Sequence, residues 1–189
     1  MSAHSMLVRC DGLCAPRNTG GVATFGWVSY TPDGAGGWER CGSSNGVAAV
    51  GADATNNVGE YRAAIEALQF HRSAIPPGRD SPPTELIVET DSQLVVRQVQ
   101  GLYAVRSPRI FPLFHKVMAL RKQYERAPFK WIPREMNKDA DLESRIAYVK
   151  YWRQRDKEPP ACRFLARAEL DEAEKAGGTV ADQAQTTLI

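Results

Sequence analysis

The sequence of 189 residues lacks two kinds of segment that would place it in a membrane or send it out of the cell. It contains no run of about 18 apolar residues, which excludes a helix that spans a bilayer. Its first residues do not combine a basic region with an apolar stretch, so we expect no secretory signal. These absences predict a cytoplasmic protein with no membrane partner.

Cysteine and histidine are also scarce, with 4 Cys and 3 His in the chain. Cys10 and Cys14 form a Cys-x-x-x-Cys pair, but no cluster of Cys or His follows to complete a zinc site. Cys10 lies in an apolar run, where a buried free thiol is the common case. We therefore expect neither a structural zinc ion nor a disulfide.

A strong excess of one charge is missing as well, because the formal net charge is only +2. The chain as a whole therefore does not indicate a polyanionic partner, and a nucleic-acid site would depend on local placement of charge. Hydrophobic residues make up 43% of the chain and charged residues 24%, as in ordinary soluble globular proteins. The length suits one domain, and we expect a monomer.

The first part of the sequence predicts three strands, at residues 6–11, 22–30 and 36–43. These segments are apolar or rich in β-branched and aromatic residues. Turn signals separate them at Asp11-Gly12, at residues 17–21 and at Pro32-Asp33-Gly34. Three strands joined by short turns predict an antiparallel meander.

The remaining pattern alternates helices with strands. A helix is predicted over residues 57–71, where Val58, Tyr61, Ile65 and Leu68 recur at helical spacing. A strand at 85–90, helices at 92–100 and 112–124, a strand at 129–132 and a helix at 137–151 follow. This order predicts an α/β fold whose sheet has a parallel part beside the antiparallel part. We assign residues 1–152 to this domain and residues 153–189 to a polar C-terminal extension, part helical and partly disordered.

Four acidic residues occupy informative positions in this scheme. Asp11 is predicted to end the first strand and Asp91 to follow the fourth, while Glu60 and Asp141 lie in the first turns of helices. The strand ends of a sheet that is parallel at its centre lie on one side, where binding sites gather. The four acids converge only if the first and fourth strands are neighbours, which the pattern does not establish. Taken singly, each acid also fits a turn or a helix N-terminus.

Carboxylates gathered in one place repel one another and raise one another's pKa. Hard divalent cations remove that penalty, and an acid cluster without His or Cys suits Mg²⁺ or Mn²⁺ better than zinc. Two such ions can hold the attacking water and the leaving oxygen of a phosphodiester in line. The acids therefore indicate metal-dependent chemistry on a nucleic acid.

Four stretches of the sequence resemble type 1 ribonuclease H and its reverse-transcriptase-associated relatives. They are Asp11-Gly12 with Asn-Thr-Gly-Gly at 18–21, Ala-Thr-Asn-Asn-Val-Gly-Glu-Tyr-Arg-Ala at 54–63, Glu-Thr-Asp-Ser-Gln at 89–93, and Pro-Arg-Glu-Met-Asn-Lys-Asp-Ala-Asp-Leu at 133–142. They follow the order and spacing of that family. The resemblance implies the ribonuclease H-like fold, a five-stranded mixed sheet flanked by helices, with the first and fourth strands adjacent.

The resemblance also implies an activity. Members of the family hydrolyse the RNA strand of RNA–DNA hybrids with two metal ions and leave 3′-hydroxyl and 5′-phosphate ends. The metal-binding acids of the family fall at Asp11, Glu60, Asp91 and Asp141. Asp139 is a nearby alternative, which we interpret as a first-turn or capping acid.

Recognition of RNA requires contacts with 2′-hydroxyl groups. The family's contacts to sugars and bases fall at Gly12, Asn56, Asn57 and Gln93, and its contacts to the phosphate of the DNA strand fall at Asn18 and Thr55. An alternative remains open here, because Thr-Asn-Asn before a helix is also a good capping sequence.

Two departures from the family pattern stand out. The stretch from 101 to 126 contains no Trp, whereas many members carry a basic, Trp-rich insertion there. The loop before the last acid has Arg134-Glu135 where many members have a His. We expect Arg134 to act in catalysis by binding the scissile phosphate or the product. The alternative is an Arg paired with Glu135 or with solvent.

Two other functions stay open. A nucleic-acid-binding module of the same fold could have weak or no catalysis, although it would have no reason to keep four acids near phosphates. A related polynucleotide nuclease, such as an exonuclease, would not need the Thr-Asn-Asn stretch.

Overall fold

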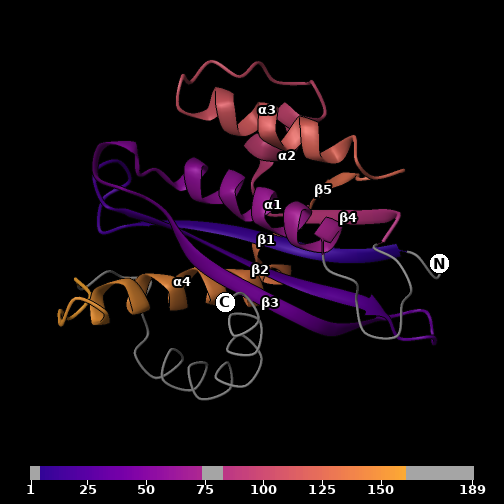
Figure 1. Cartoon of the computed structure of the whole chain (residues 1–189), viewed down its shortest axis with the longest axis horizontal. Helices are drawn as coiled ribbons and strands as arrows, with labels where there is room; N and C mark the ends of the chain where they lie inside the picture. Colours follow the sequence, from indigo (N-terminus) through magenta and orange to yellow (C-terminus); the bar gives the residue numbers. More distant parts are fainter. Residues whose placement is uncertain (1–4, 74–82, 161–189) are drawn as a thin grey trace.

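The computed structural model describes residues 5–73 and 83–160, which form a five-stranded sheet with helices on both faces (Figure 1). The strands are β1 (Ser5–Ala15), β2 (Val22–Pro32), β3 (Trp38–Val50), β4 (Glu85–Thr90) and β5 (Phe129–Trp131). The helices are α1 (Asn56–Ser73), α2 (Gln93–Val99), α3 (Ile110–Arg121) and α4 (Lys138–Arg153). Two short 3₁₀ turns, η1 (Gly51–Asp53) and η2 (Arg134–Met136), precede α1 and α4.

The order of strands across the sheet is β3-β2-β1-β4-β5. β2 pairs antiparallel with both β1 and β3, whereas β4 pairs parallel with both β1 and β5. The predicted mixed sheet is therefore confirmed, and so is the adjacency of the first and fourth strands that the resemblance implied.

The prediction that a turn at Asp11-Gly12 ends the first strand is wrong. β1 continues to Ala15, and Asp11 and Gly12 pair with Gly26 and Phe25 of β2. The local Asp-Gly signal is overridden because β2 pairs with β1 continuously from Leu7 to Ala15. Asp11 therefore lies inside a strand and not in a loop.

Two other predicted elements change their bounds. The third strand runs from Trp38 to Val50 and not over residues 36–43, because its second half pairs with the start of β2. α3 begins at Ile110 and ends at Arg121, so Pro112 lies in its first turn, where a missing N–H costs no hydrogen bond. The other elements agree with the prediction to within a few residues. Most of the predicted C-terminal extension lies outside the described residues.

The two faces of the sheet are covered differently (Figure 1). α1 packs on β1 and β2 on one face, and α3 packs on α1. The large apolar core lies under these helices and includes Met6, Val8, Ile65, Leu68 and Val88. α4 covers β1, β2 and β3 on the opposite face. None of the described helices has the length and apolar character needed to cross a bilayer.

Glycines in β1 and β2 let one helix on each face approach the sheet closely. A Cβ atom at Gly12 would overlap the backbone of Gly59 and Glu60 in α1. A Cβ atom at Gly26 would overlap the backbone of α4 at Ala140 and Ser144. These two crossings bring the first turns of α1 and α4 to neighbouring points on β1 and β2.

Candidate active site

The four predicted acids come from four different elements. Pairing of β1 with β4 runs from Ser5 opposite Glu85 to Arg9 opposite Glu89, so two more residues bring Asp11 level with Asp91. Glu60 belongs to α1 and reaches the same region from one face, and Asp141 in the first turn of α4 reaches it from the other. The sheet and the two crossings thus bring the four acids together.

Electrostatic interactions link the four acids. Burial raises the pKa of Asp11 well above its usual value, and Asp91, Asp141 and Glu60 raise it further in that order. Burial also raises the pKa of Glu60, and Asp91 adds to this effect, while the hydroxyl of Ser92 lowers the pKa. The four acids therefore form one cluster of interacting negative charge.

Neutral donors hold two of the acids in place. The Ser144 hydroxyl donates to Oδ2 of Asp11 at 3.0 Å. The Ser92 hydroxyl donates to Oε2 of Glu60 at 2.6 Å, and the Asn56 side-chain amide donates to Oε1 of Glu60 at 2.9 Å. These donors orient Asp11 and Glu60 without supplying a positive charge of their own.

Asn137 fixes the third acid. Its side-chain amide donates to Oδ1 of Asp91 at 2.8 Å and to the backbone carbonyl of Cys10 at 3.0 Å. Asn137 is fully buried, and its own Oδ1 has no hydrogen-bond partner among the described residues. One amide therefore ties the loop before α4 to both β1 and the end of β4.

Asp141 has cationic partners instead. Arg134 lies 3.1 Å from Oδ1 of Asp141, and Arg145 lies 2.5 Å from Oδ2. The side chain of Arg134 is 63% exposed, whereas that of Arg145 is 19% exposed. Arg134 thus pairs with a site acid and not with Glu135, and it presents a guanidinium group to solvent at the edge of the cluster.

Asp139 is turned away from the cluster. Its Oδ2 accepts a hydrogen bond from the Tyr30 hydroxyl at 2.8 Å. Asp139 lies in the first turn of α4, as predicted, but it does not cap the helix, because the residue at the cap is Asn137. The geometry therefore favours Asp141 over Asp139 as the fourth acid.

The predicted nucleic-acid contacts lie around the start of α1. Oδ1 of Asn18 accepts from the backbone N–H of Asn56 at 2.9 Å, and the Thr55 hydroxyl accepts from the backbone N–H of Val58 at 3.2 Å. The capping alternative is thus confirmed for Thr55. A cap that fixes this loop also fixes its amide groups, so capping and recognition are compatible.

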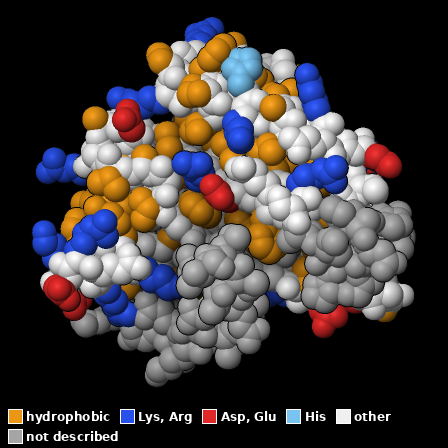
Figure 2. Space-filling model, viewed as in Figure 1, with side chains coloured by type: hydrophobic (Ala, Val, Ile, Leu, Met, Phe, Trp, Pro, Cys, Tyr) orange, Lys and Arg blue, Asp and Glu red, His pale blue; other side chains and the backbone are white. Residues whose placement is uncertain are grey.

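The other predicted contacts come from three elements. Asn57 is half-buried in the first turn of α1, and Gln93 is exposed at the first position of α2. Gly12 lies at the α1 crossing, beside the backbone of Glu60. On the face shown in Figure 2, Lys and Arg side chains are scattered among apolar side chains and do not form one basic patch.

Four residues of the site were not predicted from the sequence: Ser92, Asn137, Ser144 and Arg145. Signals for them exist, because Ser92 directly follows Asp91 at a predicted helix start. Asn137 lies four residues before Asp141 and Ser144 three residues after it. Helical spacing of three or four residues places side chains on one face.

The donor chemistry of the cluster fits a hard divalent cation. All four side chains offer carboxylate oxygens, the ligands that Mg²⁺ and Mn²⁺ prefer, and their repulsion at Asp11 is not neutralised. Within residues 5–73 and 83–160, no group of three Asp, Glu, His or Cys side chains is arranged to hold an ion as it stands. Serine, asparagine and arginine donors engage the carboxylates instead.

Comparisons with known proteins identify the family of the chain. Residues 9–147 match the family described as "Reverse transcriptase-like". The bifunctional protein Rv2228c of Mycobacterium tuberculosis is 34% identical over 136 residues, which cover 72% of this chain and 33% of that protein. An uncharacterized protein of Mycobacterium bovis matches equally well. The chain thus spans about a third of the length of these relatives.

Solved structures share the fold. The N-terminal RNase H domain of Rv2228c has a TM-score of 0.61 at 27% identity, covering 92% of this chain and 98% of that one. The RNase H1 of Halobacterium salinarum has a TM-score of 0.61 at 28% identity, covering 76% and 96%. LC11-RNase H1, solved in complex with an RNA/DNA hybrid, has a TM-score of 0.60 at 30% identity, covering 77% and 98%.

Proposed function

This chain belongs to the reverse transcriptase-like family of ribonuclease H-type proteins, and we propose that it is a metal-dependent endonuclease that hydrolyses the RNA strand of RNA–DNA hybrids. The observation that carries the proposal is the cluster of four carboxylates from four elements, in which Asp91, Asp141 and Glu60 all raise the pKa of Asp11. The hybrid bound to the similar LC11-RNase H1 supports the substrate class.

The four acids would hold two Mg²⁺ or Mn²⁺ ions. When bound, such ions supply positive charge at the attacking water and at the leaving oxygen of the phosphodiester. We expect products with 3′-hydroxyl and 5′-phosphate ends. The contribution of the chain itself is orientation, since Ser144, Ser92 and Asn137 each donate a hydrogen bond to one carboxylate.

Arg134 is the residue we propose to meet the phosphate. Its guanidinium group is exposed and lies beside Asp141 at the edge of the cluster. Arg groups bind phosphate through two parallel hydrogen bonds. Because most of its side chain is exposed, Arg134 would bind the scissile phosphate or the departing product.

Choice of the RNA strand would come from the loop before α1 and from the start of α2. Asn56, Asn57 and Gln93 offer amide donors and acceptors for sugar hydroxyls and base edges, together with the backbone at Gly12. Asn18 and Thr55 would contact the phosphate of the DNA strand. Such sugar contacts discriminate between strands, whereas phosphate contacts do not.

A panel of labelled substrates tests the proposal. The full chain is incubated with an RNA–DNA hybrid, double-stranded RNA and double-stranded DNA, with Mg²⁺, with Mn²⁺ or with a chelator. We expect cleavage of the hybrid alone, and only with metal. Binding without cleavage would support a non-catalytic module, and cleavage of double-stranded DNA would support a different polynucleotide nuclease.

A further inference from the structure

Trp131 differs from the other exposed aromatic residues of the protein. Phe70, Tyr103, Phe111 and Trp131 are each 46% to 52% exposed. Within the part of the chain that the structure describes, Phe70 packs on Trp27, Tyr103 packs on Arg97 and Phe111 packs on His115. No ring or cation contact of this kind accompanies Trp131 among those residues.

The position of Trp131 is fixed relative to the site. It is the last residue of β5 and pairs with Thr90, the residue before Asp91. Its indole N–H donates to the backbone carbonyl of Asp91 at 3.2 Å. The ring is therefore held at the rim of the acidic cluster while about half of its surface remains in water.

The charge around Trp131 suits a polyanion. The segment from 129 to 134 contains Lys130 and Arg134 and no acidic residue, although it adjoins four carboxylates. Both basic residues are exposed. Lys130 precedes Trp131 in β5, so their side chains point to opposite faces of the sheet, whereas Arg134 lies at the acidic cluster beside Asp141. An exposed ring and an exposed guanidinium group at one site are a combination that binds nucleic acid, with the cation on a phosphate and the ring on a sugar or base.

We infer that Trp131 is a substrate-contact residue whose ring packs against the sugar of a nucleotide next to the scissile phosphate. This inference rests on the proposed function, because it takes the hybrid as the ligand. The bases of a duplex are already stacked, so an exposed ring can reach the sugar edge without disturbing the helix. The hydrogen bond to Asp91 orients the ring beforehand, so little freedom is lost on binding.

Hybrid binding in the presence of a chelator tests the inference, because it requires no cleavage. Affinities of the full chain for a labelled RNA–DNA hybrid are measured by fluorescence anisotropy for the wild type, Trp131→Ala, Trp131→Phe and Phe111→Ala. Trp131→Phe keeps a ring but loses the N–H donor. Phe111→Ala removes an equally exposed ring on α3, which serves as the matched control.

We expect Trp131→Ala to weaken binding about tenfold, the loss of one aromatic contact on nucleic acid. Trp131→Phe and Phe111→Ala should stay within about twofold of the wild type. Thermal unfolding checks that each variant folds, and Trp131→Gln replaces Trp131→Ala if the latter does not.

Three results with the variants would overturn the inference. They are wild-type affinity in Trp131→Ala or its replacement, equal losses in Trp131→Ala and Phe111→Ala, and equal losses in Trp131→Ala and Trp131→Phe. The last result would mean that the indole acts only by holding Asp91. If the wild-type chain binds the hybrid through Trp131 but never cleaves it, the proposed nuclease activity is contradicted and the inferred contact of Trp131 still holds. If the wild-type chain does not bind the hybrid, the inference about Trp131 is itself contradicted.

Discussion

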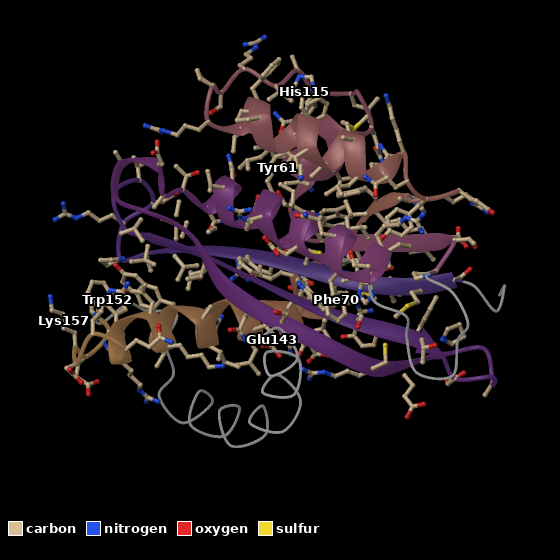
Figure 3. All side chains as sticks on the ribbon, in the orientation of Figure 1. Tyr61, Phe70, His115, Glu143, Trp152 and Lys157 are labelled. Carbon is tan, nitrogen blue, oxygen red and sulfur yellow. The ribbon has the colours of Figure 1, made fainter. Side chains whose placement is uncertain are left out.

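The two faces of the sheet hold their helices by different means. Under α1, the packing is apolar, and side chains such as Val8, Leu68 and Val88 are fully buried. Tyr61 points from α1 into this side of the molecule, and its hydroxyl donates to Gln98 of α2 at 2.8 Å (Figure 3). The polar groups on this face are few, so apolar burial holds α1 in place.

Under the first half of α4, the contacts are polar. Glu143 points from α4 towards the sheet (Figure 3), where it accepts hydrogen bonds from Asn45 at 2.5 Å and from Arg40 at 3.0 Å. The Thr24 hydroxyl donates to the backbone carbonyl of Ser144 at 2.7 Å. Apolar contacts resume only in the second half of the helix, at Tyr148 and its neighbours.

This difference between the two faces means that one mainly stabilises the fold and the other mainly aligns the acids. Apolar burial supplies most of the free energy of folding but has no direction. Hydrogen bonds between buried groups add less free energy yet fix one arrangement. The polar face is the one that carries Asp11 and Asp141, so the sheet uses directional contacts where the acids must be aligned.

A side chain added at Gly26, where the backbone of α4 approaches β2, should have the largest effect on activity. In Gly26→Ala, the new methyl group would overlap the backbone of Ala140 and Ser144, so α4 must move away from the sheet. We expect turnover to fall by roughly a hundredfold or more, as for a lost electrostatic group, and stability to fall by about 1–3 kcal/mol. Gly42→Ala is the control, since its nearest neighbour is the Ser29 hydroxyl at 3.1 Å. Equal activity of the two variants would show that the close approach of α4 is dispensable.

A cavity on the apolar face should affect stability instead. Leu68 is fully buried in the core under α1. Leu68→Ala should lower the free energy of unfolding by about 2–5 kcal/mol. The cleavage rate per folded molecule should change little. Denaturant unfolding and cleavage assays on one preparation measure both. A large loss of turnover in fully folded Leu68→Ala would mean that the two faces are not separable.

Acid should weaken the apolar face through His71. Burial lowers the pKa of His71 from 6.5 to about 4. Its Nε2 has no hydrogen-bond partner within the described residues, and its ring lies against Trp27 and Phe70. Between these two pKa values the unfolded chain binds the proton and the folded chain does not. Stability is therefore complete above pH 6.5 and falls as the pH drops towards 4.

Near the lower pH, the loss in the free energy of unfolding should reach about 3 kcal/mol, because each pKa unit corresponds to about 1.36 kcal/mol. Unfolding free energies of the wild type and His71→Phe are compared across this range. The variant should lose the part of the pH dependence that His71 causes. Parallel curves for the two proteins would show that the pKa of His71 is the same in the folded and the unfolded chain.

The smallest effect should come from one ion pair on each face. Glu143→Gln weakens the contact with half-exposed Arg40, and we expect a loss of about 1 kcal/mol with a measurable drop in turnover. Glu66→Gln weakens the exposed pair with Arg62 on α1, which is worth roughly 0.3 kcal/mol. Glu66→Gln should not change turnover. If the turnover of Glu66→Gln dropped as much as that of Glu143→Gln, the two faces would not differ in their effect on activity.

Local sequence was sufficient to predict most elements, whereas the choice of the four candidate acids came from the family resemblance. The helix that carries Glu60 follows from apolar spacing, and the strand before Asp91 was predicted with its observed bounds, Glu85–Thr90. These features depend on neighbouring residues. The adjacency of β1 and β4 depends on residues about 80 apart, and it came from the family resemblance and not from the pattern.

Contacts formed only in the folded chain explain the features that the sequence did not predict. Asp11-Gly12 has the composition of a turn, but pairing with β2 keeps it extended. The contact between Asn45 and Glu143 joins residues 98 apart, and the pair of Arg134 with Asp141 depends on how the loop before α4 folds. Such partners follow from topology, which single residues do not encode.

The most direct test of the acidic site is the cleavage rate of four single variants at saturating Mg²⁺. The variants are Asp11→Asn, Glu60→Gln, Asp91→Asn and Asp141→Asn, each assayed with the same hybrid and checked for folding. We predict that every one loses roughly a hundredfold or more in rate, while hybrid binding in a chelator is kept or becomes tighter because a negative charge is gone. A folded variant that cleaves the hybrid at close to the wild-type rate would contradict the assignment of its acid to the site.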